Sequence, residues 1–201
     1  MDVRATSQDL TPEMILAAYP KGLFPMANPG FGIITWHCPR KRAVIPLDEF
    51  HVSRSLAYTL KRAKFTVTFD TAFAAVMDSC ADRGGEDETW INDQIKSAYS
   101  GLHAKGSAHS VEVWVDGELA GGLYGVHIGG AFFAESKFHK ARDMSKVALA
   151  HLVMRLRDRG FGLLEVQYLT AHLARFGTVE LPHREYLRRL REAVALRCEF
   201  P

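Results

Sequence analysis

The sequence predicts an α/β protein in which a mixed, largely antiparallel sheet with flanking helices follows a small N-terminal domain. Three observations predict this class. Asp116-Gly117, a strong hairpin signal, joins two apolar runs at 110–115 and 118–126. From residue 143 onward, segments with helical spacing alternate with short apolar strands. A passage rich in proline and glycine at 20–30 separates an N-terminal helix from the rest, and we place the domains at 1–62 and 63–201.

The predicted elements follow one another in a recognisable order. Residues 11–19 form a helix with Thr11 as its N-cap and Pro12 at its first position. A strand at 65–69 and a helix at 71–80 precede the hairpin, and the turn after it leads into a third strand at 130–134. A helix capped by Asp143 then ends at Gly160. The strand 162–169, a helix at 170–177, a short strand at 177–181 and a final helix from Pro182 to about residue 196 complete the order, which is that of the acetyltransferase-like (GNAT) α/β fold.

Composition limits the function classes. The hydrophobic content is 47% of 201 residues, no run of 18 apolar residues occurs, and the first ten residues lack a secretory signal, so we expect a cytoplasmic protein without a membrane span. The net charge of +2 means that any nucleic-acid contact must come from local clusters. The three cysteines suggest neither a disulfide framework nor a metal site. The histidine spacings do not suit a metal either.

Two basic clusters are candidates for such contacts. One follows the third strand and contains Lys137, Lys140, Arg142 and Lys146, beside a predicted helix N-terminus that favours phosphate. That segment has no glycine-rich loop of the kind that closes around the pyrophosphate of coenzyme A, which leaves the end of a nucleic acid as a possible ligand. The other cluster lies on the final helix, where a solvated face is the alternative; its arginines are Arg184, Arg188, Arg189 and Arg191.

Carboxylates in apolar strands are the candidates for chemistry. Glu135 ends the third strand, and strand alternation places Glu165 and Gln167 on one face. A carboxylate on a core face must be paired or used, so Glu165 either forms a structural salt bridge or orients an amide or takes a proton. Trp36 and Trp90 lie beside polar turns, where an indole can stack on a base or ribose. No nucleophile elbow or P-loop occurs, so we expect a donor that arrives already activated.

Seven segments in order resemble the leucyl/phenylalanyl-tRNA–protein transferase family. They are LTPEMILAAYPKGLFPM, RAVIPLDEFHVSRSL, ETWIND, AHSVEVW, GELAGGLYGVHIGGAFFAES, DMSKVALAHL and EVQYLTAHLARFGTVELP. The resemblance implies transfer of an aminoacyl group from its tRNA ester to the N-terminal amine of a protein that begins with Arg or Lys, which marks that protein for degradation. It also implies a GNAT-like catalytic domain, a monomer, and no ATP, metal or coenzyme.

The resemblance assigns roles residue by residue. Glu135 is suited to a cationic amine or side chain, and Glu165 is expected to polarise Gln167, whose carbonyl oxygen draws a proton from the attacking amine. The donor side chain is expected in a pocket of Leu123, Phe132 and Leu164, and the terminal adenosine near Trp90. The other candidate contacts to substrate are Met26, Trp36 and Lys137, and those to tRNA are Lys140, Arg142, Lys146, Arg184 and Arg188.

Three positions depart from the family pattern. This chain has Glu165 where the family has an aspartate, Lys137 where it has a pocket methionine, and Met26 where it has a substrate-facing tryptophan. These departures leave open a transferase with another donor amino acid. A coenzyme A-dependent N-acetyltransferase and a noncatalytic RNA-binding module are the alternatives from other classes.

Overall fold

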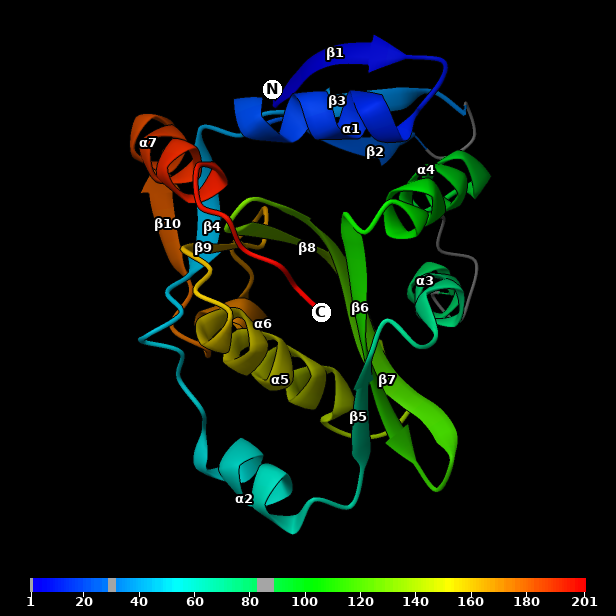
Figure 1. Cartoon of the computed structure of the whole chain (residues 1–201), viewed down its shortest axis with the longest axis vertical. Helices are drawn as coiled ribbons and strands as arrows, with labels where there is room; N and C mark the ends of the chain where they lie inside the picture. Colours follow the sequence, from blue (N-terminus) through cyan, green and yellow to red (C-terminus); the bar gives the residue numbers. More distant parts are fainter. Residues whose placement is uncertain (1, 29–31, 83–88) are drawn as a thin grey trace.

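The computed structural model describes residues 2–28, 32–82 and 89–201, and within them the chain forms two sheets flanked by helices (Figure 1). The smaller sheet is antiparallel, with the order β1 (Val3–Ser7), β3 (Ile34–His37), β2 (Phe24–Ala27). The larger sheet has the order β10 (Val179–Pro182), β4 (Lys41–Ile45), β9 (Leu163–Glu165), β8 (Ala131–His139), β7 (Glu118–Ile128), β6 (Ala108–Val115), β5 (Thr66–Phe69).

The helices cover both faces of the larger sheet. They are α1 (Pro12–Ala18), the 3₁₀ turn η1 (Tyr19–Lys21), α2 (Arg54–Arg62), α3 (Phe73–Ala81), α4 (Asp93–Ala104), α5 (Met144–Asp158), α6 (Ala171–Ala174) and α7 (His183–Val194). Helix α5 lies on one face, and α3 and α4 lie on the other (Figure 1). Alternating residues of β8 follow this division, because Phe132 belongs to the core under α5 and Phe133 to the core under α3 and α4. No helix in the described ranges is long and apolar enough to cross a membrane.

The predicted hairpin is confirmed. Asp116 and Gly117 both have positive φ, 51° and 83°, as the two central residues of a tight hairpin turn require, and β6 pairs with β7 on either side of them. Strand β8 then pairs antiparallel with β7. The three strands therefore form the predicted meander.

The larger sheet contains one parallel pair of strands among those described. Strand β8 pairs in parallel with β9, with Phe132 opposite Leu164, and α5 is the crossover between them. A parallel pair needs such a long connection, which a hairpin cannot supply. An antiparallel meander, a helix and a parallel return strand form a mixed sheet with flanking helices, so the predicted GNAT-like fold class is confirmed.

One of the two predicted helix caps is wrong. The Thr11 hydroxyl accepts a hydrogen bond from the backbone N–H of Met14, as an N-cap should. Asp143 does precede α5, but its φ is 67° and its side chain makes no capping bond. Its carboxylate lies 2.7 Å from the Lys146 Nζ instead, so the ion pair replaces the cap.

The N-terminal residues contribute to both sheets. Strands β1, β2 and β3, which the sequence patterns did not reveal, form the small sheet, whereas β4 lies between β9 and β10 in the large one. Helix α2, also missed, packs near α5. Sheet membership thus changes near residue 40, and the domain boundary at 62 stays a prediction.

Candidate active site

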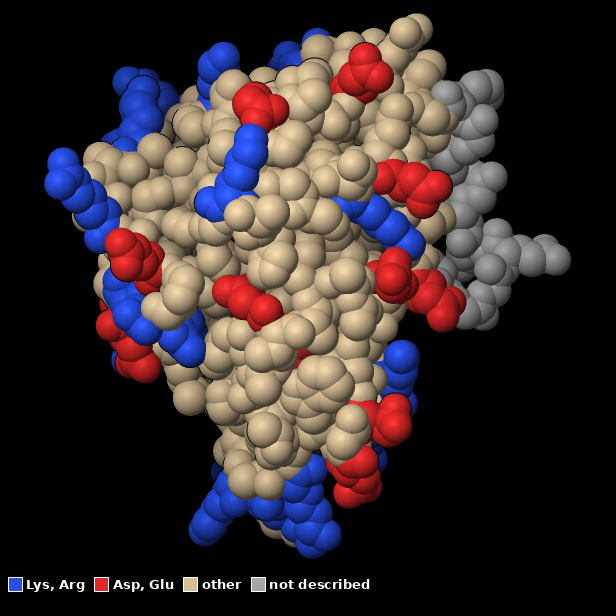
Figure 2. Space-filling view, turned by 45° about the vertical axis from the view of Figure 1, so that its right-hand side comes forward, with Lys and Arg blue, Asp and Glu red and all other residues tan. Residues whose placement is uncertain are grey.

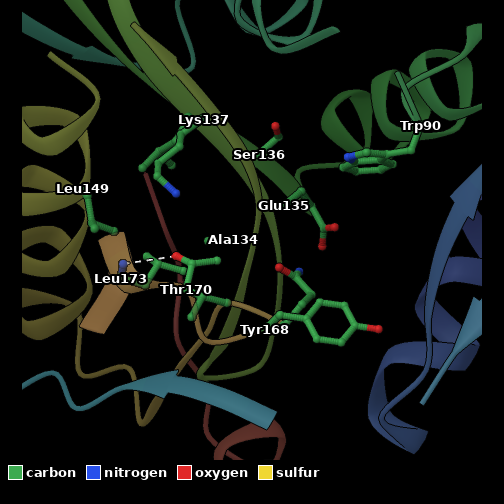
Figure 3. Close-up of a pocket in the computed structure, with 12 residues that line it drawn as sticks. Trp90, Ala134, Glu135, Ser136, Lys137, Leu149, Tyr168, Thr170 and Leu173 are labelled. Carbon is green, nitrogen blue, oxygen red and sulfur yellow. Dashed lines mark hydrogen bonds between the residues drawn. The ribbon is translucent and has the colours of Figure 1, made fainter. Parts of the chain in front are cut away.

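A cavity of about 390 Å³ opens where β7, β8, α5 and the segment after β9 meet (Figure 3). Its apolar walls are side chains of Leu123, Ala134, Leu149, Val166 and Leu173. Its polar lining comes from Glu135, Ser136, Lys137, Gln167, Tyr168 and Thr170, and Trp90 borders it as well. The cavity therefore combines an apolar end with a polar end.

A second cavity of about 140 Å³ adjoins the polar end. The two share Trp90, Glu135, Gln167 and Tyr168, and β2 supplies the remaining wall through Phe24, Pro25 and Met26. These three residues come from the passage rich in proline and glycine at 20–30. Glu135 and Gln167 thus stand at the junction of two chambers.

Glu135 is held by a chain of two tyrosines. The Tyr19 hydroxyl donates to Glu135 Oε1 at 2.7 Å, and the Tyr99 hydroxyl lies 2.7 Å from that of Tyr19. Burial raises the pKa of Glu135 to about 8, although the Tyr19 hydrogen bond opposes this shift. The empty cavity therefore favours the neutral acid at pH 7, and a cationic ligand would favour the carboxylate.

Gln167 leaves the strand instead of continuing it. Strand β9 ends at Glu165, Gln167 has a φ of 55°, and the Tyr168 N–H donates to the Val166 carbonyl at 2.8 Å, which closes a three-residue turn. The prediction that Glu165 and Gln167 share one face is wrong, because this turn breaks the alternation. Glu165 is fully buried, and Gln167 lines both cavities.

Glu165 contacts the backbone of Gln167 rather than its amide side chain. Its Oε1 accepts the Gln167 N–H at 2.6 Å and the Arg42 Nε at 2.9 Å. Among the described residues, Gln167 Nε2 is buried and has no hydrogen-bond partner. The carboxylate therefore fixes the turn, and the carboxamide is left to interact with a substrate.

The apolar end of the cavity differs from the predicted donor pocket. Leu123 lines it, but Phe132 and Leu164 are fully buried in the core against α5 and line neither chamber. Strand alternation and the position of α5 turn these two side chains away. Leu149, Val166 and Leu173 take their place; the apolar spacing of α5 indicated Leu149 as buried, but no sequence signal connected it with a cavity.

Lys137 is an unusual lining residue. Its amine points into the space that Leu149 and Leu173 border (Figure 3). Burial lowers the pKa of Lys137. No ion pair or hydrogen bond holds the Lys137 amine within the described part of the chain. The cavity expected to hold the apolar side chain of the donor therefore has the amine of Lys137 in its wall.

The two candidate tryptophans lie in different places. Trp90 borders both chambers. Trp36 lies in β3 with 6% of its surface exposed, and its Nε1 donates to the Ser7 Oγ at 3.1 Å. The prediction that Trp36 contacts substrate does not fit this position, because the strand directs its indole into the core of the N-terminal sheet.

The first basic cluster borders another cavity, of about 280 Å³. Arg142 and Lys146 line it together with His172 of α6 and with Arg175, which directly follows α6. Ser53 and Ser55 at the start of α2 also line it, and the sequence did not indicate these contributions. Helix α2 adds Lys61 and Arg62 in its last turn. Figure 2 shows lysine and arginine side chains gathered at the lower end of the molecule, where α2 lies.

The second basic cluster is largely neutralised. Arg188 forms ion pairs with Glu185 and Glu192, both at 2.7 Å, and Arg189 pairs with Glu185 at 2.8 Å. Arg184 is exposed on the same helix, and Lys140 lies over the Phe138 ring after β8. Arg188 therefore fits the alternative interpretation, in which this side of the final helix is a solvated surface rather than a nucleic-acid contact.

Comparison with known proteins connects this site to a family. Residues 44–191 match the Leucyl/phenylalanyl-tRNA protein transferase family, and residues 8–40 match its N-terminal domain. The chain belongs to the leucyl/phenylalanyl-tRNA–protein transferase family. It is 50% identical to the transferase of that name from Nitrobacter winogradskyi, over 100% of this chain and 90% of the relative. With the transferase from Salinibacter ruber the identity is 49%, over 92% and 81% of the two chains.

Membership in the transferase family makes the chain an aminoacyltransferase, and it does not favour the acetyltransferase or the noncatalytic alternative. Among solved structures, FemX is similar with a TM-score of 0.53 and 12% sequence identity, over 72% of this chain and 60% of FemX. At this identity the likeness concerns the fold alone.

Proposed function

We propose that this transferase moves a leucyl or phenylalanyl group from its tRNA ester to the N-terminal amine of proteins that begin with Arg or Lys, and so marks them for degradation. The observation that carries the proposal is the junction of the two chambers, where Glu135 and Gln167 lie between an apolar end and a wall supplied by the N-terminal sheet. We also propose that the protein acts in the cytoplasm as a monomer.

The donor would occupy both chambers. Its apolar side chain fits the end bordered by Leu123, Leu149 and Leu173, because removing such a side chain from water is favourable. Its terminal adenosine would lie at the smaller chamber, where the Trp90 indole offers a face for stacking and Met26 an apolar contact. The ester then lies at the junction, beside Glu135 and Gln167.

The reaction needs positioning more than activation. The ester is already activated, so the free amine attacks its carbonyl carbon, a C–N bond forms and the bond to the ribose oxygen breaks. The Gln167 carbonyl oxygen accepts a hydrogen bond from the attacking amine and orients its lone pair. The amine proton passes to the ribose oxygen as it leaves, so atoms and charge balance without a metal or coenzyme.

Glu135 explains a preference for a cationic N-terminal residue. It is a carboxylic acid in the lining of both chambers, and burial raises its pKa, so the carboxylate would be stabilised by a cationic partner. An arginine or lysine of the acceptor would supply that partner and favour the carboxylate. A charge-assisted hydrogen bond in this buried position would be stronger than one at the surface.

The tRNA would approach over the first basic cluster. Arg142 is 92% exposed and borders the cavity that also contains Lys146 and Arg175. Asp143 pairs closely with Lys146, at 2.7 Å, and only loosely with Arg142, at 3.7 Å, so the exposed Arg142 and Arg175 are the cations most available to phosphate there.

The test is transfer of radiolabelled amino acids from a complete pool of charged tRNA to peptides that differ in their N-terminal residue. We expect leucine and phenylalanine on peptides that begin with Arg or Lys, and no label on the same peptides with an acetylated amine. A parallel reaction with acetyl-coenzyme A should transfer nothing. Label from a different amino acid alone, or on other N-terminal residues, would contradict the proposal.

A further inference from the structure

Arg42 is a buried charged residue that the proposed reaction does not use. It lies on β4 with 1% of its side chain exposed, and its buried partner Glu165 has no exposed surface. Burying an ion pair costs solvation, so such a pair is weak evidence for stability and invites another explanation.

The Arg42 guanidinium contacts four residues from three separate parts of the chain. Its Nε donates to Glu165 at the end of β9 at 2.9 Å, and its Nη1 donates to the Gly22 carbonyl after η1 at 2.5 Å. Its plane lies between two rings, 4.8 Å from the centroid of Phe24 and 4.6 Å from that of Tyr186. Although burial opposes the charge, Glu165 raises the pKa of Arg42 above its usual range. Arg42 therefore connects the N-terminal sheet, α7 and the catalytic sheet.

The ion pair leads directly to the candidate site. The same Glu165 oxygen that accepts from Arg42 also accepts the backbone N–H of Gln167 at 2.6 Å. Gln167 has a positive φ of 55°, a conformation that a non-glycine residue adopts only when its surroundings impose it. The neighbouring bonds of β4 add to this restraint, because Ala43 N–H donates to the Gln167 carbonyl at 3.1 Å.

We propose that Arg42 is a positioning residue for aminoacyl transfer. Held by Gly22 and two aromatic rings, it fixes the Glu165 carboxylate, which in turn holds Gln167 in its three-residue turn with the carboxamide at the cavity junction. The proposal rests on the proposed function for its catalytic consequence, and on the hydrogen bonds for its structural part.

Arginine is required here because its planar group donates in two fixed directions. A lysine would keep the charge beside Glu165, but its single ammonium cannot reproduce both the bond to Glu165 and the bond to Gly22 with the same rigidity. Arg42→Lys should therefore lower kcat about 10- to 100-fold, the range expected when a catalytic group is misplaced by about 1 Å. The KM for aminoacyl-tRNA and the affinity for tRNA should change little.

A second variant separates positioning from folding. Arg42→Met together with Glu165→Gln removes both charges, so no unpaired charge remains buried, and the new amide still offers an acceptor to Gln167. We expect this double variant to fold and to have a low kcat. The matched control is Lys41→Met with Glu180→Gln, which removes the exposed ion pair at the neighbouring position of β4; its kcat should equal that of the wild type.

Hydrogen exchange supplies a readout that does not depend on activity. Arg42→Lys should speed exchange of the Gln167 amide, with little effect on the amides of β6 and β7. A wild-type kcat in Arg42→Lys or in the double variant, or unchanged exchange at Gln167, would overturn the positioning role. Faster exchange at Gln167 with no aminoacyl transfer by the wild type would support the positioning of the turn and refute the proposed function instead.

Discussion

Burial raises the pKa of Glu135 to about 8, so the residue changes charge near that pH. Below that pH it is a neutral acid, and above it the carboxylate can pair with a cationic acceptor. We expect kcat/KM to rise with pH through about 8, because this parameter reports groups of the free enzyme. The acceptor amine titrates nearby, at about 7.7–8.0.

Two variants distinguish Glu135 from the amine. Tyr19→Phe removes the hydrogen bond that lowers the pKa of Glu135, so the midpoint of the profile should move to higher pH. In Glu135→Gln, the pH profile of kcat/KM should show only the rise caused by deprotonation of the acceptor amine. Identical pH profiles for the wild type and Tyr19→Phe would show that Glu135 does not control the rise, and Tyr58→Phe, at an exposed tyrosine, is the control.

Gln167 should matter for turnover more than for binding. If its carbonyl orients the attacking amine, Gln167→Ala should lower kcat roughly 10²-fold or more, the scale of assistance to proton transfer. Filter binding should show nearly unchanged affinity for tRNA. Gln8→Ala, at an exposed glutamine, is the control, and a normal kcat in Gln167→Ala would exclude the role.

Lys137 should weaken binding of an apolar donor. A leucyl side chain in the cavity would remove water from the amine without offering it a partner, which costs about 1–3 kcal/mol. Lys137→Met should therefore lower the KM for leucyl-tRNA about 10-fold, measured by initial rates. Lys21→Met, at an exposed position, should have no effect. A higher KM in Lys137→Met would mean that the amine contributes to donor binding.

At the scale of elements, the start of α5 brings basic residues together with α6 and α2. The strand-to-helix connection places Arg142 and Lys146 beside Arg175, which lies far along the chain. The helix itself is long enough for its N-terminus to contribute a positive potential. The basic surface at the start of α5, rather than α7, is therefore the stronger candidate for contact with tRNA phosphate.

Salt dependence tests that assignment. Replacing Arg142 and Arg175 with Ala should weaken tRNA binding and reduce the slope of log K against log salt by roughly 1.4–1.8, about two phosphate contacts. Arg188→Ala should leave the slope unchanged, because its charge is already paired with Glu185 and Glu192. A smaller slope in Arg188→Ala together with an unchanged slope in the double variant would place the tRNA along α7.

At the scale of the whole molecule, the C-terminal segment completes the core under α5. Phe200 is fully buried, 4.3 Å from the His109 ring and 5.4 Å from the Phe132 ring, although it is the last residue but one. Arg155 of α5 donates to its carbonyl at 3.5 Å. The segment after α7 thus joins the sheet to α5 on the face opposite α3 and α4.

Phe200→Ala should lower the free energy of unfolding by about 3–5 kcal/mol, the usual cost of removing a buried phenylalanine. Denaturant unfolding measures this loss, and kcat should be normal at temperatures where the variant is folded, because Phe200 lines neither chamber. Met154→Ala, at a half-exposed position of α5, should change stability by about 0.5 kcal/mol or less. A small effect of Phe200→Ala would mean that the segment is not part of the cooperative core.

The sequence by itself determined the parts of this transferase that depend on neighbouring residues. The Asp116-Gly117 turn, the Thr11 cap and the helical spacing of α5 are local signals, and each predicted its element correctly. The quoted segments also determined the family and named Glu135, Gln167, Trp90 and Lys137, which the structure brings together around one cavity.

Tertiary structure alone decided what depends on residues far apart. Strand β4 joins the large sheet through pairing with β9 and β10, which no local pattern encodes. Phe132 and Leu164 pack in the core because α5 covers their face of the sheet. The direction of the Gln167 side chain follows from the positive φ of this residue. The Glu165 carboxylate imposes that φ through its hydrogen bond to the Gln167 N–H, and Arg42, 123 residues before Glu165, holds the carboxylate in place. Such long-range restraints leave no periodicity in the sequence.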